Sequence, residues 1–336
     1  MKHITRRRCL QIIAANVVGG LHLAANPSQA LGNEKGLQKV TWQGVVLGAN
    51  AHITLFTQNG EQAKPLISSM LKEVQRLEGL FSLYQDQSTL SALNRTGELA
   101  HPPTEFHELV NTALSTAEQT QGAFDPTIQP LFLAYKTLAK SRVPGPWHEH
   151  KTVRDAKQLI NWQNVKCTKS AISFAKPGMG LTLNGIAQGY ITDKATHILK
   201  QAGFAHCLIN FGEYHSLGPK PDQTDWNIQL GTSKDRPIWQ LQNEALAASS
   251  RHGLIFDEHQ NLHHLLTPQT GSTQPAWQEI YVKAHTATLA DAASTALFAA
   301  PPSQARTIAQ RLKVTKALLI KRNGTKLELD GPEQSS

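Results

Sequence analysis

The sequence predicts one α/β domain (α+β mixed) in which helices pack on a mixed β-sheet. Two observations indicate this class. Stretches with strand character and stretches with helical spacing follow one another along the chain, but they do not alternate strictly as βαβ units do. The 336 residues contain no internal repeat and no linker, and this length is sufficient for one large domain.

The N-terminal half is predicted to begin with two strands around a turn within residues 37–57. Helices are expected at 61–80, 88–94 and 104–121, because apolar side chains recur there near helical spacing. Thr104 would cap the third helix, since acidic residues follow it in the first turn. Residues 143–150 contain two prolines and a glycine and predict a loop.

The C-terminal half contains further apolar stretches of both kinds. Strands are expected at 171–174, 180–183, 207–210, 226–230, 278–283 and 317–320. Helices are expected at 186–202, 288–299 and 303–312. This order gives the mixed sheet and the covering helices of the predicted domain.

The first thirty residues have the layout of an export signal. Residues 1–30 carry four basic residues and no acid, then an apolar stretch, and they end in Ser28-Gln29-Ala30, a small-x-small cleavage site. The run Thr5-Arg-Arg-Arg-Cys-Leu10 resembles the twin-arginine signature. We therefore expect a twin-arginine-type signal peptide at 1–30, a domain at 31–336, and a periplasmic protein. A basic arm with a short buried helix is the alternative.

The net charge of +8 does not indicate a nucleic-acid partner. Half of it lies in residues 1–30, so residues 31–336 carry only +4. That is an ordinary surface charge, and we expect no nucleic acid among the partners.

Cysteine usage excludes a disulfide framework and a zinc ribbon. The predicted domain contains only Cys167 and Cys207, and no CxxC occurs. An oxidising compartment would permit one disulfide between them, and the sequence leaves their pairing open.

Several segments carry residues suited to chemistry, in a fixed order. They are Phe81-Ser-Leu-Tyr84 with Ser88 and Asn94, Gly122-Ala-Phe-Asp-Pro-Thr127, Leu183-Asn-Gly-Ile-Ala-Gln-Gly-Tyr190 with Asp193, Asn210-Phe-Gly-Glu-Tyr214, His264-Leu-Leu-Thr-Pro-Gln-Thr-Gly271, and Ala290-Asp-Ala-Ala-Ser-Thr-Ala-Leu-Phe298. Together they resemble the ApbE-type FAD:protein FMN transferases. The twin-arginine signal and the Gly-Glu-Tyr variant resemble the NosX-type subgroup, which is associated with nitrous-oxide reduction. The resemblance implies a single ApbE-like domain.

The last segment contains a candidate metal site. Asp291 and Thr295 are four residues apart in an expected helix, so their side chains share one face. A carboxylate and a hydroxyl are oxygen ligands that suit Mg²⁺. The spacing alone is also that of ordinary helix positions; the ordered set of segments favours the metal. The resemblance adds a backbone carbonyl ligand from Gly185.

Other residues are candidates for binding FAD. Backbone N–H groups of Gly185 and Gly189, near the start of a helix, could hold phosphate oxygens. Tyr84 could stack on a ring of the cofactor or be a half-buried core residue. Asp125 could fix its loop or bond a cofactor hydroxyl.

The resemblance also implies cofactor contacts for Asp193 and Asn210, and a catalytic role for His264 near the pyrophosphate or the attacking hydroxyl. The neighbouring His263 is expected to be solvated.

The resemblance implies a reaction and its partners. With Mg²⁺ bound, a Ser or Thr hydroxyl of an acceptor flavoprotein would attack the FMN phosphorus of FAD, and AMP would leave. The acceptor would be a membrane-bound electron-transfer protein of respiration, serving nitrous-oxide reduction. If water attacked instead, the chain would be an FAD pyrophosphatase.

The chain departs from the family pattern at several positions of the expected site, including Ala248-Ser249-Ser250 where the family usually has Thr-Ser-Gly, and four others bear on the activity. They are Thr182, Gln188, Glu213 and Thr267, where the family usually has Asp, Lys, Gly and Asp. These departures leave open a periplasmic FAD-binding or flavin-carrier protein without transferase activity.

Overall fold

The computed structural model describes residues 21–23, 36–143, 145–231, 235–251, 255–257, 262–263, 265–272 and 276–331. The strands are β1 (Leu21–Leu23), β2 (Gln38–Val46), β3 (Ala49–Thr57), β4 (Glu98–Ala100), β5 (Val165–Cys167), β6 (Ala171–Phe174), β7 (His206–Asn210), β8 (Tyr214–Leu217), β9 (Trp226–Leu230), β10 (Ile238–Leu241), β11 (Ala245–Ser250), β12 (Ile255–Asp257), β13 (Leu262–His263), β14 (Trp277–Ala284), β15 (Lys316–Lys321) and β16 (Lys326–Asp330). The helices are α2 (Gly60–Phe81), α3 (Thr89–Thr96), α4 (Thr104–Gln119), α5 (Gln129–Ser141), α6 (Lys151–Lys157), α7 (Ala187–Gln201), α8 (Ala287–Ala299) and α9 (Ala305–Arg311). Short 3₁₀ turns lie at Pro126–Ile128, Trp147–Glu149, Trp162–Asn164 and Pro302–Gln304.

Eight strands form the main sheet, in the order β16-β15-β14-β11-β8-β7-β3-β2. Every neighbouring pair in this order is antiparallel. The expected mixture of parallel and antiparallel strands is therefore wrong, while the α+β class is confirmed. Short hairpin connections build both ends of the sheet, and such connections produce antiparallel pairs. A long-range pair, in which β3 lies beside β7, joins the β2–β3 hairpin to the rest of the sheet.

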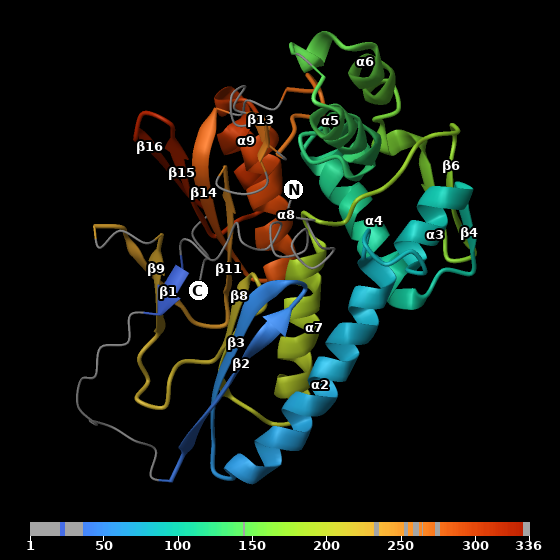
Figure 1. Ribbon diagram of the computed structural model, residues 1–336. Helices are drawn as coiled ribbons and strands as arrows, with labels where there is room; N and C mark the ends of the chain where they lie inside the picture. Colours follow the sequence, from blue (N-terminus) through green and yellow to red (C-terminus); the bar gives the residue numbers. More distant parts are fainter. Residues whose placement is uncertain are drawn as a thin grey trace.

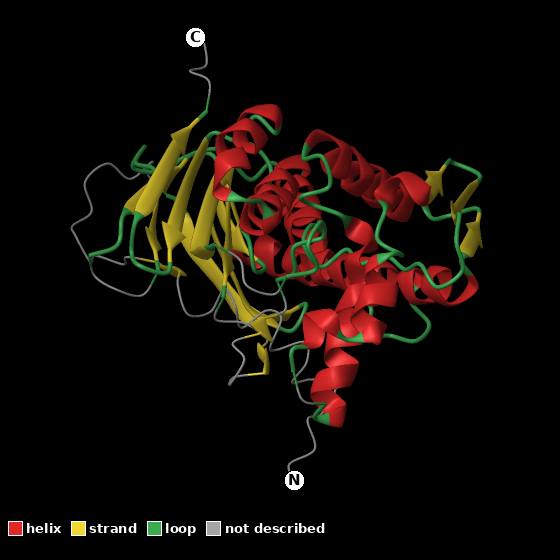
Figure 2. Cartoon of the chain, turned by 90° about the horizontal axis from the view of Figure 1, so that it is seen from above, coloured by secondary structure: helices red, strands yellow, loops and turns green. Residues whose placement is uncertain are grey.

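Helices cover one face of this sheet, as the view from above shows (Figure 2). In Figure 1, α7 and α8 lie next to the strands and α2 runs along the outside of α7. The largest apolar cluster fills the space between the helices and the sheet. The small sheet β4-β6-β5 lies beyond the helices (Figure 2).

The opposite face of the sheet is also buried. There β9 and β10 contribute Trp226, Ile228, Leu230, Trp239 and Leu241 to a second apolar cluster with residues of the main sheet. Strand β9 also pairs with β1, which lies inside the expected signal segment. Burial on both faces explains why β15 is apolar at consecutive positions, Ala317 to Ile320.

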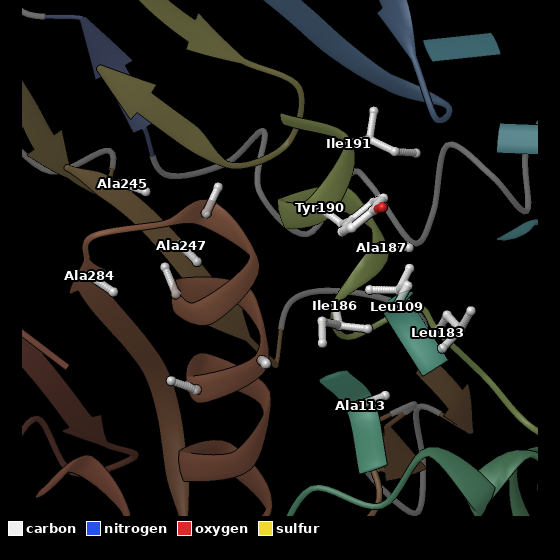
Figure 3. Packing of buried hydrophobic residues seen from close by; sticks show 14 of the residues in the cluster. Leu109, Ala113, Leu183, Ile186, Ala187, Tyr190, Ile191, Ala245, Ala247 and Ala284 are labelled. Carbon is white, nitrogen blue, oxygen red and sulfur yellow. The ribbon is translucent and has the colours of Figure 1, made fainter. Parts of the chain in front are cut away.

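The closest contact between the layers is made by α8. Figure 3 shows α8 against the strands that carry Ala245, Ala247 and Ala284, and all three alanines are fully buried. The facing side of α8 is also rich in alanine. Small side chains on both surfaces let the helix backbone approach the sheet closely, which fixes the position of the functional groups that α8 carries.

Residues 180–183 form no strand, although Gly180, Leu181 and Leu183 are buried, so the strand predicted there is wrong. The side chain of Asn94 takes the place of a strand neighbour. Its Nδ2 donates to the Leu181 carbonyl at 2.8 Å, and its Oδ1 accepts from the Leu181 N–H at 2.7 Å. The predicted cap at Thr104 is also wrong, because Pro103 occupies the N-cap position of α4.

Cys167 and Cys207 are both free thiols in the structure, and they lie in different sheets. Within the part of the chain that is described, no helix combines the length and the apolar character needed to cross a membrane. Apart from Leu21–Leu23, the predicted signal at 1–30 lies outside the described residues, so the boundary at residue 30 stays a prediction.

Candidate functional site

The site is built where the beginning of α7 meets the side of α8. The carbonyl of Ala287 approaches Gly189 so closely that a Cβ at Gly189 would lie 2.2 Å from that oxygen. The Gly189 N–H donates to Asp291 Oδ2 at 3.0 Å. Glycine is therefore required at position 189 by the contact between the two helices, and its amide holds the Asp291 carboxylate in place.

A cavity opens beside this contact. Its described lining combines an apolar part and a polar part: Ala123, Phe124, Asp125, Pro126, Ile128, Gln129, Phe132, Thr182, Asn184, Gly185, Gln188, Glu213, Ala248, Ser249, Ser250, Leu265, Leu266, Pro268, Asp291, Thr295 and Ala299. The aromatic and aliphatic side chains suit a planar ring system, and the polar groups suit phosphate or a cation.

The structure brings the three predicted metal ligands together in this cavity. Asp291 and Thr295 lie one turn apart on the same face of α8, as the spacing predicted. Gly185 faces them, because a Cβ at Gly185 would lie only 2.8 Å from Thr295 Oγ1. The loop before α7 and the middle of α8 are far apart in the sequence. In this cavity the loop supplies a backbone oxygen, and α8 supplies a hydroxyl and a carboxylate oxygen.

The electrostatics of the cavity favour a cation. Its described lining contains Asp125, Glu213 and Asp291 and no Lys, Arg or His. Burial is the main cause that raises the pKa of Asp291 to about 7; the charge of Asp193 adds to the shift, and the Gly189 hydrogen bond opposes it. Burial, together with the charge of Asp291, also holds the pKa of Glu213 well above its usual range.

The donor set fits a hard divalent cation such as Mg²⁺. The three oxygen groups are of the type that Mg²⁺ prefers, and the described lining of the cavity carries three acidic side chains and no basic one. Within the described ranges, no group of three or more His, Cys, Asp and Glu residues is arranged to bind a metal. A site here would therefore depend on a hydroxyl and a carbonyl in addition to carboxylate.

A second, smaller cavity adjoins the first. It is lined by Tyr84 and by residues at the end of α2, and Asn184 and Gln188 line both cavities. The Gln188 Nε2 is buried and has no hydrogen-bond partner among the described residues. Tyr84, for which the sequence left ring stacking and a half-buried core position open, lines this second cavity. A long ligand could extend from the first cavity past Gln188 toward Tyr84.

Asp125 fixes its loop. Its Oδ1 accepts from Thr127 N at 2.8 Å and from Thr127 Oγ1 at 2.6 Å, and its Oδ2 accepts from Trp162 N at 3.3 Å. The side chain is also at the cavity wall. Of the two roles that the sequence left open, the loop-fixing one is observed directly, and contact with a cofactor stays a prediction.

Asp193 and Asn210 are not among the residues that line the two cavities. Asp193 instead accepts hydrogen bonds from Ala287 N at 2.8 Å and Thr288 N at 2.9 Å, at the start of α8, and pairs with His215 at 2.7 Å. Asn210 Oδ1 accepts from Gly212 N at 2.9 Å in the turn before β8. In the structure both residues support the backbone around the site.

The phosphate-binding role predicted for the Gly189 N–H is not supported, because that N–H is bonded to Asp291. Gly185 keeps its place at the cavity wall. His264 lies outside the described residues, and its catalytic role stays a prediction. Leu265 and Leu266, which follow it in the sequence, line the cavity.

His263 is buried, so the expectation that it is solvated is wrong. It is only 4% exposed. Arg251 Nη2 donates to its Nε2 at 2.6 Å, and Arg251 is equally buried.

The sequence did not predict that α5 forms part of the cavity wall. Gln129 and Phe132 of α5 line it, and no helix was expected at 129–141. A signal was present, because Leu131, Ala134, Tyr135 and Leu138 recur at helical spacing after Pro130. Tyr135 OH donates to the Gly271 carbonyl at 2.9 Å, which connects α5 to the segment that begins at Leu265.

Comparison with known proteins agrees with this geometry. The ApbE family profile matches residues 47–319. A protein of Haemophilus influenzae named FAD:protein FMN transferase is 23% identical over 327 residues, covering 91% of this chain and 93% of that protein. One of the same name from Treponema pallidum is 24% identical over 279 residues, covering 76% of each.

Solved structures share the fold. The apo form of the flavinyl transferase ApbE of Pseudomonas stutzeri superposes with a TM-score of 0.75 at 20% identity, covering 90% of this chain and 97% of that one. The ApbE protein of Thermotoga maritima superposes with a TM-score of 0.76 at 22% identity, covering 87% of this chain and 97% of that one. With a family profile that spans most of its length, this chain belongs to the ApbE family.

Proposed function

We propose that the chain is a Mg²⁺-dependent FAD:protein FMN transferase. The observation that carries the proposal is the cavity, in which Gly185, Asp291 and Thr295 meet and no basic side chain lines the described wall. A pyrophosphate would be repelled by such a wall unless a cation came with it. The names of the curated relatives support the same activity.

Each part of the cavity has a task in this reaction. The Phe124, Phe132 and Leu266 side chains offer apolar surface to a ring of FAD. The Gln188 amide N–H groups, which have no partner in the described part of the chain, are suited to donate to a phosphate oxygen. Asp291, held by Gly189, and Thr295 would hold Mg²⁺ with the Gly185 carbonyl. Bound Mg²⁺ supplies charge neutralisation at the pyrophosphate.

The transfer forms one bond to the FMN phosphorus and breaks another. The hydroxyl oxygen of an acceptor Ser or Thr forms a bond to the FMN phosphorus, and the bond from that phosphorus to the AMP oxygen breaks. AMP leaves, and FMN stays on the acceptor as a phosphoester. The hydroxyl proton goes to a base, for which His264 is the proposed residue. Water in place of the hydroxyl would give free FMN and AMP.

The reaction requires an acceptor protein, and the N-terminal segment indicates where the two would meet. An exposed Ser or Thr on a partner flavoprotein is the acceptor that the reaction requires. The basic, apolar and small-residue pattern of residues 1–30 supports export by the twin-arginine route to the periplasm. A membrane-bound respiratory protein that serves nitrous-oxide reduction is the acceptor that the NosX-like features favour.

The test is co-expression with a candidate acceptor and detection of covalent flavin by fluorescence in a denaturing gel. Wild type with FAD and Mg²⁺ should label the acceptor, and chelation of the metal should stop labelling until Mg²⁺ is restored. Asp291→Ala and Thr295→Ala should each reduce labelling at least tenfold. Asp155→Asn, which changes an exposed carboxylate in α6, is the control and should label normally.

Two outcomes would contradict the proposal. FAD binding without label on any acceptor would favour a flavin carrier, and release of AMP without label would favour a pyrophosphatase. Full activity of Asp291→Ala would remove that carboxylate from the site.

A further inference from the structure

Glu213 lies in the short turn between β7 and β8. Gly212 precedes it with a φ of +107°, a conformation that glycine adopts readily. The Gly212 N–H donates to Asn210 Oδ1 at 2.9 Å, and the Phe211 N–H donates to the Glu213 carbonyl at 3.2 Å. This tight turn places the Glu213 side chain in the cavity wall, where the residue is only 3% exposed.

The Glu213 carboxylate is incompletely paired. The Ala248 backbone supplies a hydrogen bond to it, but Oε2 is buried and has no hydrogen-bond partner among the described residues. No Lys, Arg or His in the described lining of the cavity balances its charge. Leaving a buried acceptor without a hydrogen-bond partner destabilises the protein, and the effect is larger for a charged group. A ligand that supplies positive charge at Oε2 would remove this cost.

Asp291 is a charged neighbour of Glu213. Its negative charge acts on the Glu213 carboxyl, and both residues line the same cavity. Two buried carboxylates that repel each other are stabilised by a divalent cation placed between them. The unpaired oxygen, the shared cavity and the absence of basic lining residues all indicate the same kind of ligand.

We propose that Glu213 is a second carboxylate ligand of the divalent cation, together with Asp291. The inference rests on the proposed magnesium site and adds to it a residue from the β7–β8 turn. The cation would then be held from two sides, by α8 and by the β7–β8 turn of the main sheet. Its binding would join these two layers.

The experiment measures metal binding by the purified full-length protein without FAD or acceptor. Calorimetric titration with Mg²⁺ and with Mn²⁺ should show at least tenfold weaker binding for Glu213→Gln than for wild type. Thermal unfolding gives a second readout. Without metal, Glu213→Gln should be at least as stable as wild type, and Mg²⁺ should raise its melting temperature less.

Controls separate this role from a general effect of charge. Glu244→Gln removes a largely shielded carboxylate that pairs with Lys283 at 2.9 Å outside the cavity, and it should bind metal as wild type does. Glu213→Asp keeps the carboxylate on a shorter side chain and should bind with intermediate affinity. It also serves as the test if Glu213→Gln does not fold.

Wild-type metal affinity in both Glu213 variants would overturn the inference, even if FMN transfer is confirmed. Conversely, metal binding that depends on Glu213 would support the inference even if no acceptor is ever labelled, a result that would contradict only the proposed transferase activity.

Discussion

The N–H of Gly189 donates a hydrogen bond of 3.0 Å to Asp291 Oδ2, and this bond connects the first turn of α7 to the middle of α8. The same glycine lies against the backbone of Ala287. One position thus sets the distance between two helices and orients a carboxylate of the site. The arrangement leaves no room for a side chain at residue 189.

Gly189→Ala should therefore destabilise the protein. The new Cβ would lie 2.2 Å from the Ala287 carbonyl oxygen and 2.7 Å from the Thr288 nitrogen, both of which are backbone atoms. Backbone cannot move aside as a flexible side chain can, so we expect a loss of about 2–3 kcal/mol in the free energy of unfolding, at the upper end of overpacking effects. Denaturant unfolding measures it.

Gly79→Ala is the matched control for that substitution. Gly79 lies within α2, and its nearest outside atom, the Gln85 Oε1, would be 3.9 Å from a new Cβ. Alanine favours a helix over glycine by about 0.5–1 kcal/mol, so this variant should be more stable than wild type. Equal stability of the two variants would show that the α7–α8 contact is looser than described.

Asp193→Ala should loosen the start of α8. The Asp193 carboxylate accepts from the N–H groups of Ala287 and Thr288, and loss of a cap of this kind costs about 0.5–2 kcal/mol. Because α8 also carries Asp291 and Thr295, metal affinity should fall together with stability. Denaturant unfolding and calorimetry report the two effects.

Asp222→Ala provides the comparison for Asp193. Asp222 caps Thr224 in an exposed loop, with a hydrogen bond of 3.0 Å to the Thr224 N–H. Its loss should change stability by less than about 0.5 kcal/mol, as is usual for surface positions. If Asp193→Ala is no more harmful than this variant, α8 does not depend on the cap from α7.

Asp125 should give the stability a defined pH dependence. Burial raises its pKa above 3.8, although hydrogen bonds from Thr127 and Trp162 oppose the shift. The folded chain thus holds this proton more tightly than the unfolded chain does. The contribution of Asp125 is largest below the unfolded pKa and is lost as the pH rises through the folded value.

The Asp125→Asn variant carries an amide at this position, which does not ionise, so its stability lacks the contribution of Asp125 to the pH dependence. The free energy of unfolding of wild type, minus that of Asp125→Asn, should therefore fall as the pH rises above 3.8, the ordinary value. Denaturant unfolding at several pH values measures this difference. A difference that rises with pH would mean that the hydrogen bonds outweigh burial and that the pKa is lowered.

The two thiols of the domain should be unreactive in the native protein. Burial raises the pKa of Cys167 to about 11 and that of Cys207 to about 12. The thiolate is the reactive form, so at pH 8 little of either thiol can react. Iodoacetamide labelling with mass spectrometry should show slow modification, slowest at Cys207, and rapid modification of both after unfolding. Rapid native labelling of Cys207 would contradict its burial.

Helices with clear hydrophobic periodicity, and strands rich in strand-forming residues, were mostly predicted from the sequence. The expected strand at 171–174 is β6, and the expected strand at 226–230 is β9. The spacing of Asp291 and Thr295 predicted that both face one cavity, because helical geometry alone places them on the same side.

Strand β11 could not be predicted from its residues. Its sequence, Ala-Leu-Ala-Ala-Ser-Ser, is poor in the side chains that favour strands. It nevertheless lies between β14 and β8 in the main sheet. Its small side chains make room for α8, and Ser249 Oγ lies 2.8 Å from Ser294 Oγ of that helix. The packing of distant elements, rather than local preference, determines this strand.

The segment 180–183 illustrates the opposite error. Its apolar residues predicted a strand, but its backbone bonds to the Asn94 side chain and to the Pro126 carbonyl. No sequence pattern reports that a side chain 87 residues away satisfies the N–H and the C=O of Leu181. The role of Asp193 was missed for the same reason, because its partners lie on a helix far along the chain.

The pairing of β3 with β7 has a consequence for how the chain acquires its structure. Ile53 pairs with Ile209, so the residues between these strands must form a long loop before the β2–β3 hairpin can join the rest of the sheet. Closing so long a loop is entropically unfavourable and slows folding relative to proteins built from local contacts. During synthesis, the β2–β3 hairpin leaves the ribosome well before its neighbour does. Until β7 arrives, one side of that hairpin presents unpaired backbone groups, so the nascent chain is exposed to misassociation for longer than a helical protein of this length.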